Sequence, residues 1–336
     1  MHYVPLGSSG LKVSQLCLGA MNFGGRSTDA AAAKIVGMAR DAGVNFIDTA
    51  ESYAGGKSEE VLSKLIKRDR DSWVLATKLG SKAIKDGPNQ RGLSRAWMMD
   101  AIEGSLTRLK TDYIDIYYLH RADPGTPMEE TLGAMGDLIA QGRVRYWGFS
   151  NFRAWKIADM VRLADSMGVP RPIIAQPYYS ILYRAAEFEY LPACDAYGIG
   201  VVPYSPLARG VLTGRFGTDP KAAKAAVADM PWAASYGDVF NERELTAAAK
   251  VKARAEASGM TAGQFALNWV LANGIVTSVI AGPRTVAHWK DYLGAFDHPF
   301  GPDDEAFIDD LLHPGYPFPI GYHEQKDNPV GRVPPA

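Results

Sequence analysis

The chain has few cysteines and almost no net charge. Of its 336 residues only Cys17 and Cys194 are cysteines, and 36 Lys and Arg nearly balance 37 Asp and Glu, which leaves a formal net charge of −1. A chain without an excess of one sign does not attract nucleic acid or an anionic membrane, so we expect neither as a partner. Both cysteines lie in or beside apolar segments, which predicts buried thiols in a reducing compartment.

Several motifs are also absent from the sequence. No run is apolar enough to cross a bilayer, and the N-terminus has no basic region followed by an apolar stretch, so we expect a soluble cytoplasmic protein. Scattered histidines without His-Glu-x-x-His argue against a metal site, and the lack of Gly-x-Ser-x-Gly argues against a serine hydrolase. No Gly-x-Gly-x-x-Gly follows a strand and opens a helix, so a dinucleotide would need another cradle.

The chain does contain a regular alternation of short apolar runs with segments of helical spacing. The apolar runs lie at 16–21, 44–49, 73–77, 113–119, 144–149, 172–176, 199–204 and 275–280. The helical segments include 29–42, 58–68, 95–109, 129–141, 153–167, 187–197 and 243–257, and we expect Thr28, Ser94 and Asn151 to cap three of them. Strand alternating with helix predicts a parallel α/β sheet, and eight strands predict a closed (β/α)8 TIM barrel.

We expect one domain over residues 1–336. Its parts are a β-hairpin over 2–15, the barrel over 16–299 and an extended C-terminal tail over 300–336. The connection at 205–242 is too long for a simple βα loop, which indicates a lid or binding loop on the functional rim. After a short helix at 303–312, the tail is so rich in proline and glycine that we expect it to lie across the barrel mouth.

Four titratable residues, Asp48, Tyr53, Lys78 and His120, lie at or just beyond the ends of three consecutive apolar runs. Each alone has an ordinary explanation: a helix cap, a loop tyrosine, a surface lysine or a core histidine. In a barrel, however, the carboxyl ends of the strands form the catalytic face. A phenol is a poor acid unless a cation lies near it, and a buried cation needs a carboxylate. Together the four predict proton donation to a carbonyl oxygen, with a neutral imidazole orienting the substrate.

The motifs around these residues resemble the aldo-keto reductase family. They are NFIDTAESYAGGKSEE (45–60), VLATKLG (74–80), DYIDIYYLHRAD (112–123) and VVPYSPLARGVLTGRF (201–216), and the similarity runs from Leu6 to about Arg332. The resemblance implies a (β/α)8 barrel that binds NADPH without a Rossmann domain. It also implies hydride transfer between nicotinamide and an aldehyde or ketone, with Tyr53 as general acid, Lys78 lowering its pKa, Asp48 holding Lys78, and His120 orienting the oxygen.

A candidate cradle for the cofactor phosphates follows the last apolar run, in AGPRTVAHWKDYLGA (281–295). Gly282 permits close approach of the backbone, Arg284 offers a cation, and Thr285 begins a helix whose N–H groups favour anions. By resemblance Arg284 pairs with the 2′-phosphate of NADPH; the alternative is a helix-capping arginine on the surface. His288 and Tyr292 replace the usual Gln and Asn, while Asp291 keeps the acidic position, so the ratio of NADPH to NADH use stays open.

The resemblance assigns further cofactor positions. Ser150, Asn151 and Gln176 match residues that hold the carboxamide; Tyr204 matches the aromatic under the nicotinamide; Ser205, Pro206, Leu207 and Arg215 match the pyrophosphate loop; Arg209, Ala20 and Met21 are further candidates. Met21 and Phe23 are expected as pocket walls, with a core role as the alternative for Met21. Trp232, Trp289, Tyr316 and Phe318 either close the pocket or pack in the core.

The alternative function is a cofactor-sensing regulatory protein similar to the potassium-channel β subunits, which share the barrel. In those relatives asparagine commonly stands at the position of His120, so the histidine favours catalysis. The sequence leaves the physiological substrate, the direction of reaction and the oligomeric state open.

Overall fold

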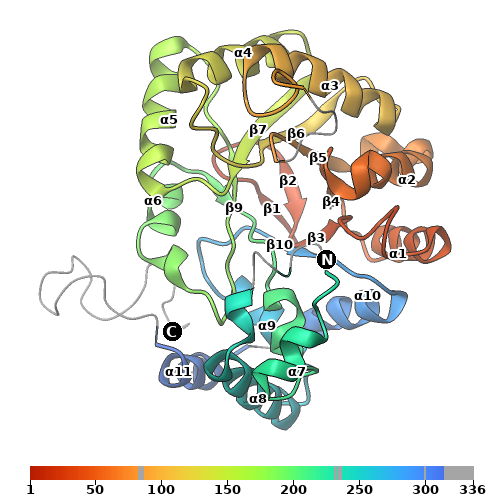
Figure 1. Cartoon of the computed structure of the whole chain (residues 1–336), viewed down its shortest axis with the longest axis vertical. Helices are drawn as coiled ribbons and strands as arrows, with labels where there is room; N and C mark the ends of the chain where they lie inside the picture. The colour runs from red at the N-terminus through yellow and green to blue at the C-terminus, as the bar shows by residue number, and fades with distance from the viewer. Residues whose placement is uncertain (82–86, 231–232, 234–236, 299, 314–336) are drawn as a thin grey trace, which may run out of the picture.

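The computed structural model describes residues 1–81, 87–230, 233, 237–298 and 300–313. One parallel sheet runs in the order β10-β3-β4-β5-β6-β7-β8-β9, and helices surround it (Figure 1). Its strands are β3 (Leu16–Gly19), β4 (Phe46–Asp48), β5 (Val74–Leu79), β6 (Ile114–Leu119), β7 (Val144–Ser150), β8 (Ile174–Gln176), β9 (Gly200–Val201) and β10 (Val279–Ala281). Every expected apolar run supplies one strand, which confirms the (β/α)8 barrel.

The helices follow the predicted alternation with a few differences. They are α1 (Asp29–Asp41), α2 (Lys57–Ile66), α3 (Arg95–Leu109), α4 (Met128–Ala140), α5 (Ala154–Met167), α6 (Tyr190–Ala196), α7 (Pro220–Ala225), α8 (Glu242–Ala257), α9 (Ala262–Leu271), α10 (Val286–Leu293) and α11 (Pro302–Leu311). The segment expected at 187–197 is shorter, because a 3₁₀ turn at Ala185–Glu187 precedes α6. Helix α9 was not among the expected segments; it begins with a capping box between Thr261 and Gln264.

The barrel closes between its last two strands through few backbone contacts. Val201 of β9 forms a parallel bridge with Val276, and the N–H of Ile280 donates to the carbonyl of Pro203 over 3.0 Å. Strand β9 is much shorter than the run at 199–204 because Pro203 has no N–H for the ladder. The pairing resumes at Tyr204, which bridges Tyr178 beyond β8.

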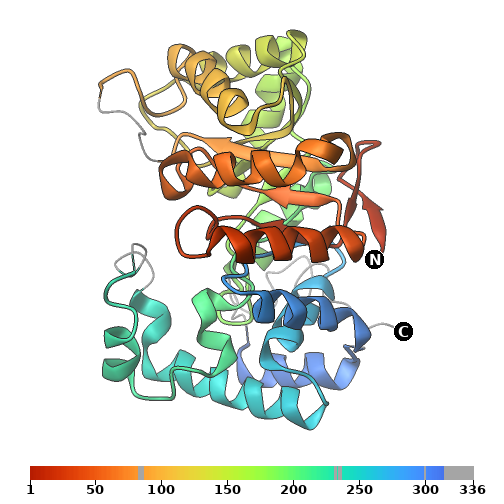
Figure 2. The ribbon, with the colours of Figure 1, turned by 90° about the vertical axis from the view of Figure 1, so that its right-hand side faces the viewer.

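The N-terminal hairpin of β1 (Tyr3–Pro5) and β2 (Lys12–Ser14) closes one end of the barrel, as Figure 2 shows. Leu6 and Val13 are fully buried and pack with the residues of the barrel interior. The turn sits so close to the strands that a Cβ on Gly7, at φ +55°, would lie 2.6 Å from the carbonyl oxygen of Ile173. Only glycine fits there, so Gly7 allows the hairpin to pack this closely against the end of the barrel.

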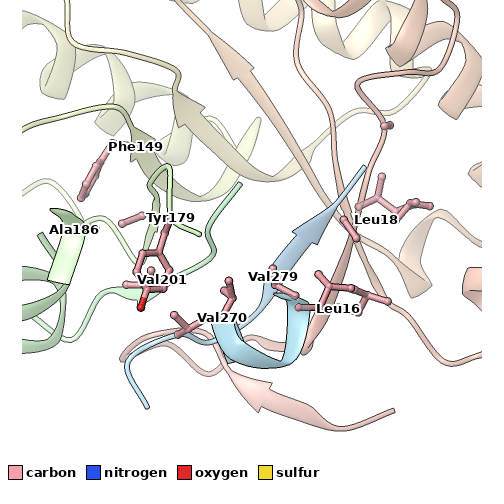
Figure 3. Packing of buried hydrophobic residues seen from close by; sticks show 14 of the residues in the cluster. Leu16, Leu18, Phe149, Tyr179, Ala186, Val201, Val270 and Val279 are labelled. Carbon is pink, nitrogen blue, oxygen red and sulfur yellow. The ribbon is translucent and has the colours of Figure 1, made fainter. Parts of the chain in front are cut away.

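Side chains of successive strand residues point alternately into the barrel and out toward the helices. In β5, Val74 and Ala76 belong to the interior cluster, whereas Leu75 belongs to the outer layer between sheet and helices. Figure 3 shows part of the outer layer, in which Val279 of β10 lies beside Leu16 of β3. Cys17 and Cys194 are both buried in these cores, as the sequence indicated.

Two of the three expected helix caps are confirmed. The side chain of Thr28 accepts the N–H of Ala31, and that of Ser94 accepts the N–H of Trp97. The expectation for Asn151 is wrong, because α5 starts only after Arg153 and Asn151 takes the left-handed φ of +60°. Its amide is instead engaged at the carboxyl end of the barrel, as described below.

The described parts of the connection at 205–242 and of the tail contain helical segments. The connection contains a 3₁₀ segment at Ala208–Thr213, helix α7 and a 3₁₀ segment at Gly237–Phe240, and its Val211, Leu212 and Phe240 are buried. The short helix expected at 303–312 is α11, which Arg254 and Arg184 hold through ion pairs to its aspartates. Residues 314–336 lie outside the described residues, so the course of the tail across the mouth stays a prediction. In the described part of the chain, no helix is both long and apolar enough to cross a membrane.

Candidate active site

Strand register places three of the predicted catalytic residues inside one end of the barrel. Asp48 follows the inward-facing Phe46 by two residues, and Lys78 follows the inward-facing Ala76 by two, so both point into the barrel. His120 stands two residues after the inward-facing Tyr118, directly beyond the end of β6. Because all strands are parallel, these side chains meet at the carboxyl end, opposite the hairpin.

Lys78 and Asp48 form a buried ion pair between neighbouring strands. Lys78 is 0% exposed and Asp48 2% exposed, and the ammonium also donates to the carbonyl oxygen of Thr49 over 2.7 Å. The other oxygen of Asp48 accepts from Nε2 of Gln176 at 2.9 Å. Burial lowers the pKa of Lys78, but Asp48 and Tyr53 together raise it above its usual value. The lysine therefore keeps its proton and its charge.

The hydroxyl of Tyr53 is the third partner of this ammonium. Lys78 Nζ donates to the Tyr53 oxygen over 3.3 Å and also lies 4.9 Å from the centre of the ring. Burial raises the pKa of Tyr53, and although Lys78 and Arg209 both lower it, the net pKa is raised above the usual value of a phenol. The expectation that Lys78 lowers the pKa holds for its own contribution, but burial outweighs it. The phenol is thus protonated at neutral pH, the form that donates a proton.

His120 lies beside the tyrosine in its neutral form. The centres of the two rings are 6.0 Å apart and the rings meet edge to face. Burial and the charges of Lys78 and Arg121 hold the pKa of His120 well below its usual 6.5. Within the described residues its buried Nδ1 has no hydrogen-bond partner. A neutral imidazole bears one N–H and donates a hydrogen bond without giving up a proton.

The residues expected to hold the carboxamide form one hydrogen-bonded chain. Asn151 Nδ2 donates to the carbonyl of His120 and to Ser150 Oγ, both at 2.9 Å, and Asn151 Oδ1 accepts from the hydroxyl of Tyr204 at 2.8 Å. Ser150 Oγ in turn donates to the backbone carbonyl of Gln176 at 2.7 Å. Side-chain and backbone hydrogen bonds therefore link the ends of β6, β7, β8 and β9, and the Gln176 side chain extends the link to the Asp48–Lys78 pair.

The segment after β9 turns over the first loop of the barrel. Ser205, Ala208 and Arg209 all adopt left-handed φ angles between 46° and 58°, which non-glycine residues rarely do outside functional sites. Arg209 Nη1 lies 4.0 Å from the sulfur of Met21, and Met21 is 37% exposed. Pro206 is buried, and Leu207 and Arg209 are half-buried. The expected pyrophosphate loop thus faces the site.

The segment after β10 has the features expected of a phosphate cradle. Gly282 is exposed, and a Cβ there would meet only the carbonyl oxygen of Gly19, at 3.8 Å. Thr285 caps α10 by accepting the N–H of His288 at 3.3 Å. Arg284 and Arg215 are exposed and form no ion pair within the described residues. Open backbone beside unpaired cations fits an anionic dinucleotide.

Several other predicted residues are buried or form contacts within the fold. Phe23 and Trp289 are fully buried, so Phe23 is a core residue rather than a pocket wall, and packing is right for Trp289. Ala20 is also fully buried and accepts from Ser58 Oγ at 2.8 Å. Asp291 accepts the hydroxyl of Thr261 at 2.8 Å. Trp232, Tyr316 and Phe318 lie outside the described residues. Within the described ranges, no three His, Cys, Asp or Glu gather as metal ligands.

Glu51, which the sequence did not single out, joins the loops of Tyr53 and Lys78. Its N–H donates to the carbonyl of Lys78 at 3.1 Å, and its Oε1 accepts the N–H of Gly80 at 3.0 Å. Its Oε2 is buried without a partner in the part of the chain described. Burial raises the pKa of Glu51 to about 7. The hydrogen bond from the Gly80 N–H and the charge of Arg108 act against this rise, and the charge of Glu59 adds to it. The only signal in the sequence was an acidic residue two positions before Tyr53.

Replacing Glu51 by Gln should remove a pH dependence of stability. Because the pKa is 4.5 for an ordinary Glu carboxyl and about 7 in the folded chain, folding favours the protonated acid. The free energy of unfolding should therefore fall as the pH rises from about 4.5 to about 7, by roughly 3 kcal/mol at about 1.4 kcal/mol per pKa unit. Chemical denaturation across this interval should show the fall in the wild type and not in Glu51→Gln.

The matched control is Glu60→Gln, which removes an exposed carboxylate on the neighbouring α2. It should keep the wild-type slope. A Glu51→Gln variant that follows the wild type at every pH would contradict the assignment of a charge-burial cost to Glu51.

Comparisons with known proteins agree with this geometry. The sequence profile of the aldo/keto reductase family matches residues 15–313. A probable voltage-gated potassium channel subunit beta of Arabidopsis thaliana is 38% identical over 304 residues, and a protein of the same description from Oryza sativa subsp. japonica is 40% identical over 307; each alignment covers 88% of this chain and 92% of the relative. Uncharacterized oxidoreductase YrpG of Bacillus subtilis (strain 168) is 36% identical over 333 residues, 96% of this chain and 99% of that protein. The resemblance read from the motifs is confirmed, and the chain belongs to the aldo/keto reductase family, a family of NAD(P)-dependent oxidoreductases.

Proposed function

We propose that the chain is a cytoplasmic NADP(H)-dependent reductase that converts an aldehyde or ketone to an alcohol, or catalyses the reverse. One observation carries this proposal: a single buried ammonium, that of Lys78, contacts both the Asp48 carboxylate and the Tyr53 hydroxyl at the carboxyl end of the barrel. When bound, the nicotinamide supplies or accepts the hydride. The residues of the chain supply the proton and hold the carbonyl oxygen.

Tyr53 gives its proton to the oxygen of the carbonyl as that oxygen gains negative charge. The Lys78 ammonium stabilises the phenolate left behind. Asp48 keeps this ammonium charged through the ion pair, and Gln176 holds the Asp48 carboxylate in place by a hydrogen bond. His120, neutral and edge-on to Tyr53, donates a hydrogen bond to the same oxygen and so fixes the angle of approach. No covalent intermediate is required.

The residues proposed to hold the dinucleotide lie on one rim. Ser150, Asn151 and Gln176 would hold the carboxamide, Tyr204 would lie against the ring, and Arg209, Arg215 and Arg284 would meet the phosphates. Tyr204 is half-buried and fixed through its hydroxyl to Asn151, which supports a preset ring position. Arg215 and Arg284 are exposed and form no ion pair within the described residues, which supports a preference for a phosphorylated ligand.

The test is consumption of NADPH with a panel of aldehydes and ketones. We expect the absorbance of NADPH to fall faster after an aldehyde is added than before. When NADH replaces NADPH, the absorbance of the cofactor should fall more slowly. The alcohol product should appear in equal amount. Absence of consumption with every carbonyl compound, together with absence of NADPH binding, would overturn the proposal.

A second function, a cofactor-sensing regulatory protein, is favoured by the two relatives described as probable potassium channel β subunits. The oxidoreductase relative covers more of the chain and favours catalysis. The neutral imidazole of His120 beside Tyr53 favours catalysis too. NADPH binding without turnover across the panel would support the regulatory function instead.

A further inference from the structure

Two loops far apart in the sequence are joined beyond the ends of the neighbouring strands β3 and β10. The strands pair Leu18 with Ala281, so the loops that follow them lie side by side. Asn22 Nδ2 donates to the carbonyls of Gly282 and Pro283 at 3.3 and 3.2 Å. Ser27 Oγ donates to the backbone carbonyl of Arg284 at 2.9 Å. The first loop is therefore hydrogen-bonded to the candidate phosphate segment at two positions, Asn22 and Ser27.

This fastening brings Arg26 next to Arg284. Arg26 directly precedes Ser27, which holds the backbone of Arg284, and both arginines are exposed. Burial and then the charge of Arg284 lower the pKa of Arg26. Arg215 belongs to the same group, because after burial the charges of Arg284 and Arg26 lower its pKa as well. The three guanidiniums thus lie within electrostatic reach of one another.

The cluster of Arg26, Arg215 and Arg284 lacks a counter-charge of its own. None of the three forms an ion pair within the described ranges. Asp291, on α10, forms no ion pair with any of the three in that part of the chain. Like charges held together without a partner cost free energy, and an anion that binds among them recovers it. A phosphate monoester carries close to two negative charges and offers three oxygens that accept hydrogen bonds from guanidinium groups.

We propose that Arg26, beside Arg284, is a further guanidinium for the 2′-phosphate of NADPH and strengthens the discrimination against NADH. This inference rests on the proposed function. It adds a residue from the first loop to a site otherwise assigned to the segments after β9 and β10. The 2′-phosphate is the group that NADH lacks, so the contribution of Arg26 falls on one cofactor and spares the other.

The experiment compares Arg26→Gln with the wild type by calorimetric titration of adenosine 2′,5′-bisphosphate, NADPH and NADH. A hydrogen-bonded contact to a charged group is worth roughly a tenfold change in affinity. We expect roughly tenfold weaker binding of the bisphosphate and of NADPH, with NADH unchanged. Arg26→Lys should weaken the binding of the bisphosphate and of NADPH less than Arg26→Gln does, because lysine keeps the positive charge and loses only the paired N–H donors of the guanidinium. The control Lys34→Gln removes one exposed positive charge from α1, outside the cluster, and should leave all affinities unchanged.

The outcomes separate this inference from the function on which it rests. Wild-type binding of NADPH with an unchanged Arg26→Gln variant overturns the inference and leaves the proposed function standing. Equal weakening of NADPH and NADH also overturns it, because Arg26 would then act on a shared group or on the fold. If the wild type binds neither dinucleotide, the proposed function fails and the inference falls with it.

Discussion

Tyr53→Phe is expected to lower kcat by at least about 10²–10⁴-fold, the usual contribution of a positioned general acid. The change removes one oxygen, and Lys78 keeps its contacts to Asp48 and to the carbonyl of Thr49. The variant should therefore fold normally and bind NADPH with unchanged affinity. Steady-state kinetics with the best aldehyde of the panel, together with a fluorescence titration of NADPH, measure the two quantities separately.

Tyr197→Phe serves as the control, because it removes the hydroxyl of a half-buried tyrosine that follows α6, away from the site. It should keep the wild-type kcat. A Tyr53→Phe enzyme that turns over at nearly the wild-type rate would remove Tyr53 as the proton donor.

Lys78→Met is expected to abolish turnover and also to destabilise the fold. The substitution leaves the carboxylate of Asp48, 2% exposed, without its cation. Removing one partner of a buried ion pair typically costs about 3–5 kcal/mol. Burial raises the pKa of Asp48, so the loss should shrink at acidic pH, where the carboxyl takes up a proton. Urea unfolding at neutral and acidic pH gives the free energies of unfolding.

The double variant Asp48→Asn with Lys78→Met separates the two effects. It removes both charges and keeps an oxygen for Gln176, so it should recover much of the lost stability while remaining inactive. If the double variant were as unstable as Lys78→Met, an uncompensated charge would not be the cause.

The strands were predictable because strands of a parallel barrel are buried on both faces and read as continuous apolar runs. Asp48, Lys78 and His120 could be placed for the same reason, since each ends such a run. Their roles beyond placement depend on neighbours, and there the prediction was less complete. Burial raises the net pKa of Tyr53. The sequence did not predict this, because the depth at which a side chain is buried cannot be read from residue types.

Features that arise from long-range closure were not predictable. Asn151 stands before a helix as a cap would, yet its side-chain amide donates to the carbonyl of His120 at the end of the neighbouring strand, β6. Arg26 is an ordinary loop arginine until β3 and β10 pair and bring it to Arg284. Phe23 looked like a rim residue because a loop position carries no record of which way the chain turns.

The hairpin at the base of the barrel also constrains access to the interior. Because Leu6 and Val13 fill that end, whatever reaches the interior must come and go through the opposite opening. The dinucleotide and the carbonyl compound of the proposed reaction would therefore both enter at the carboxyl end of the strands, on the side of Lys78.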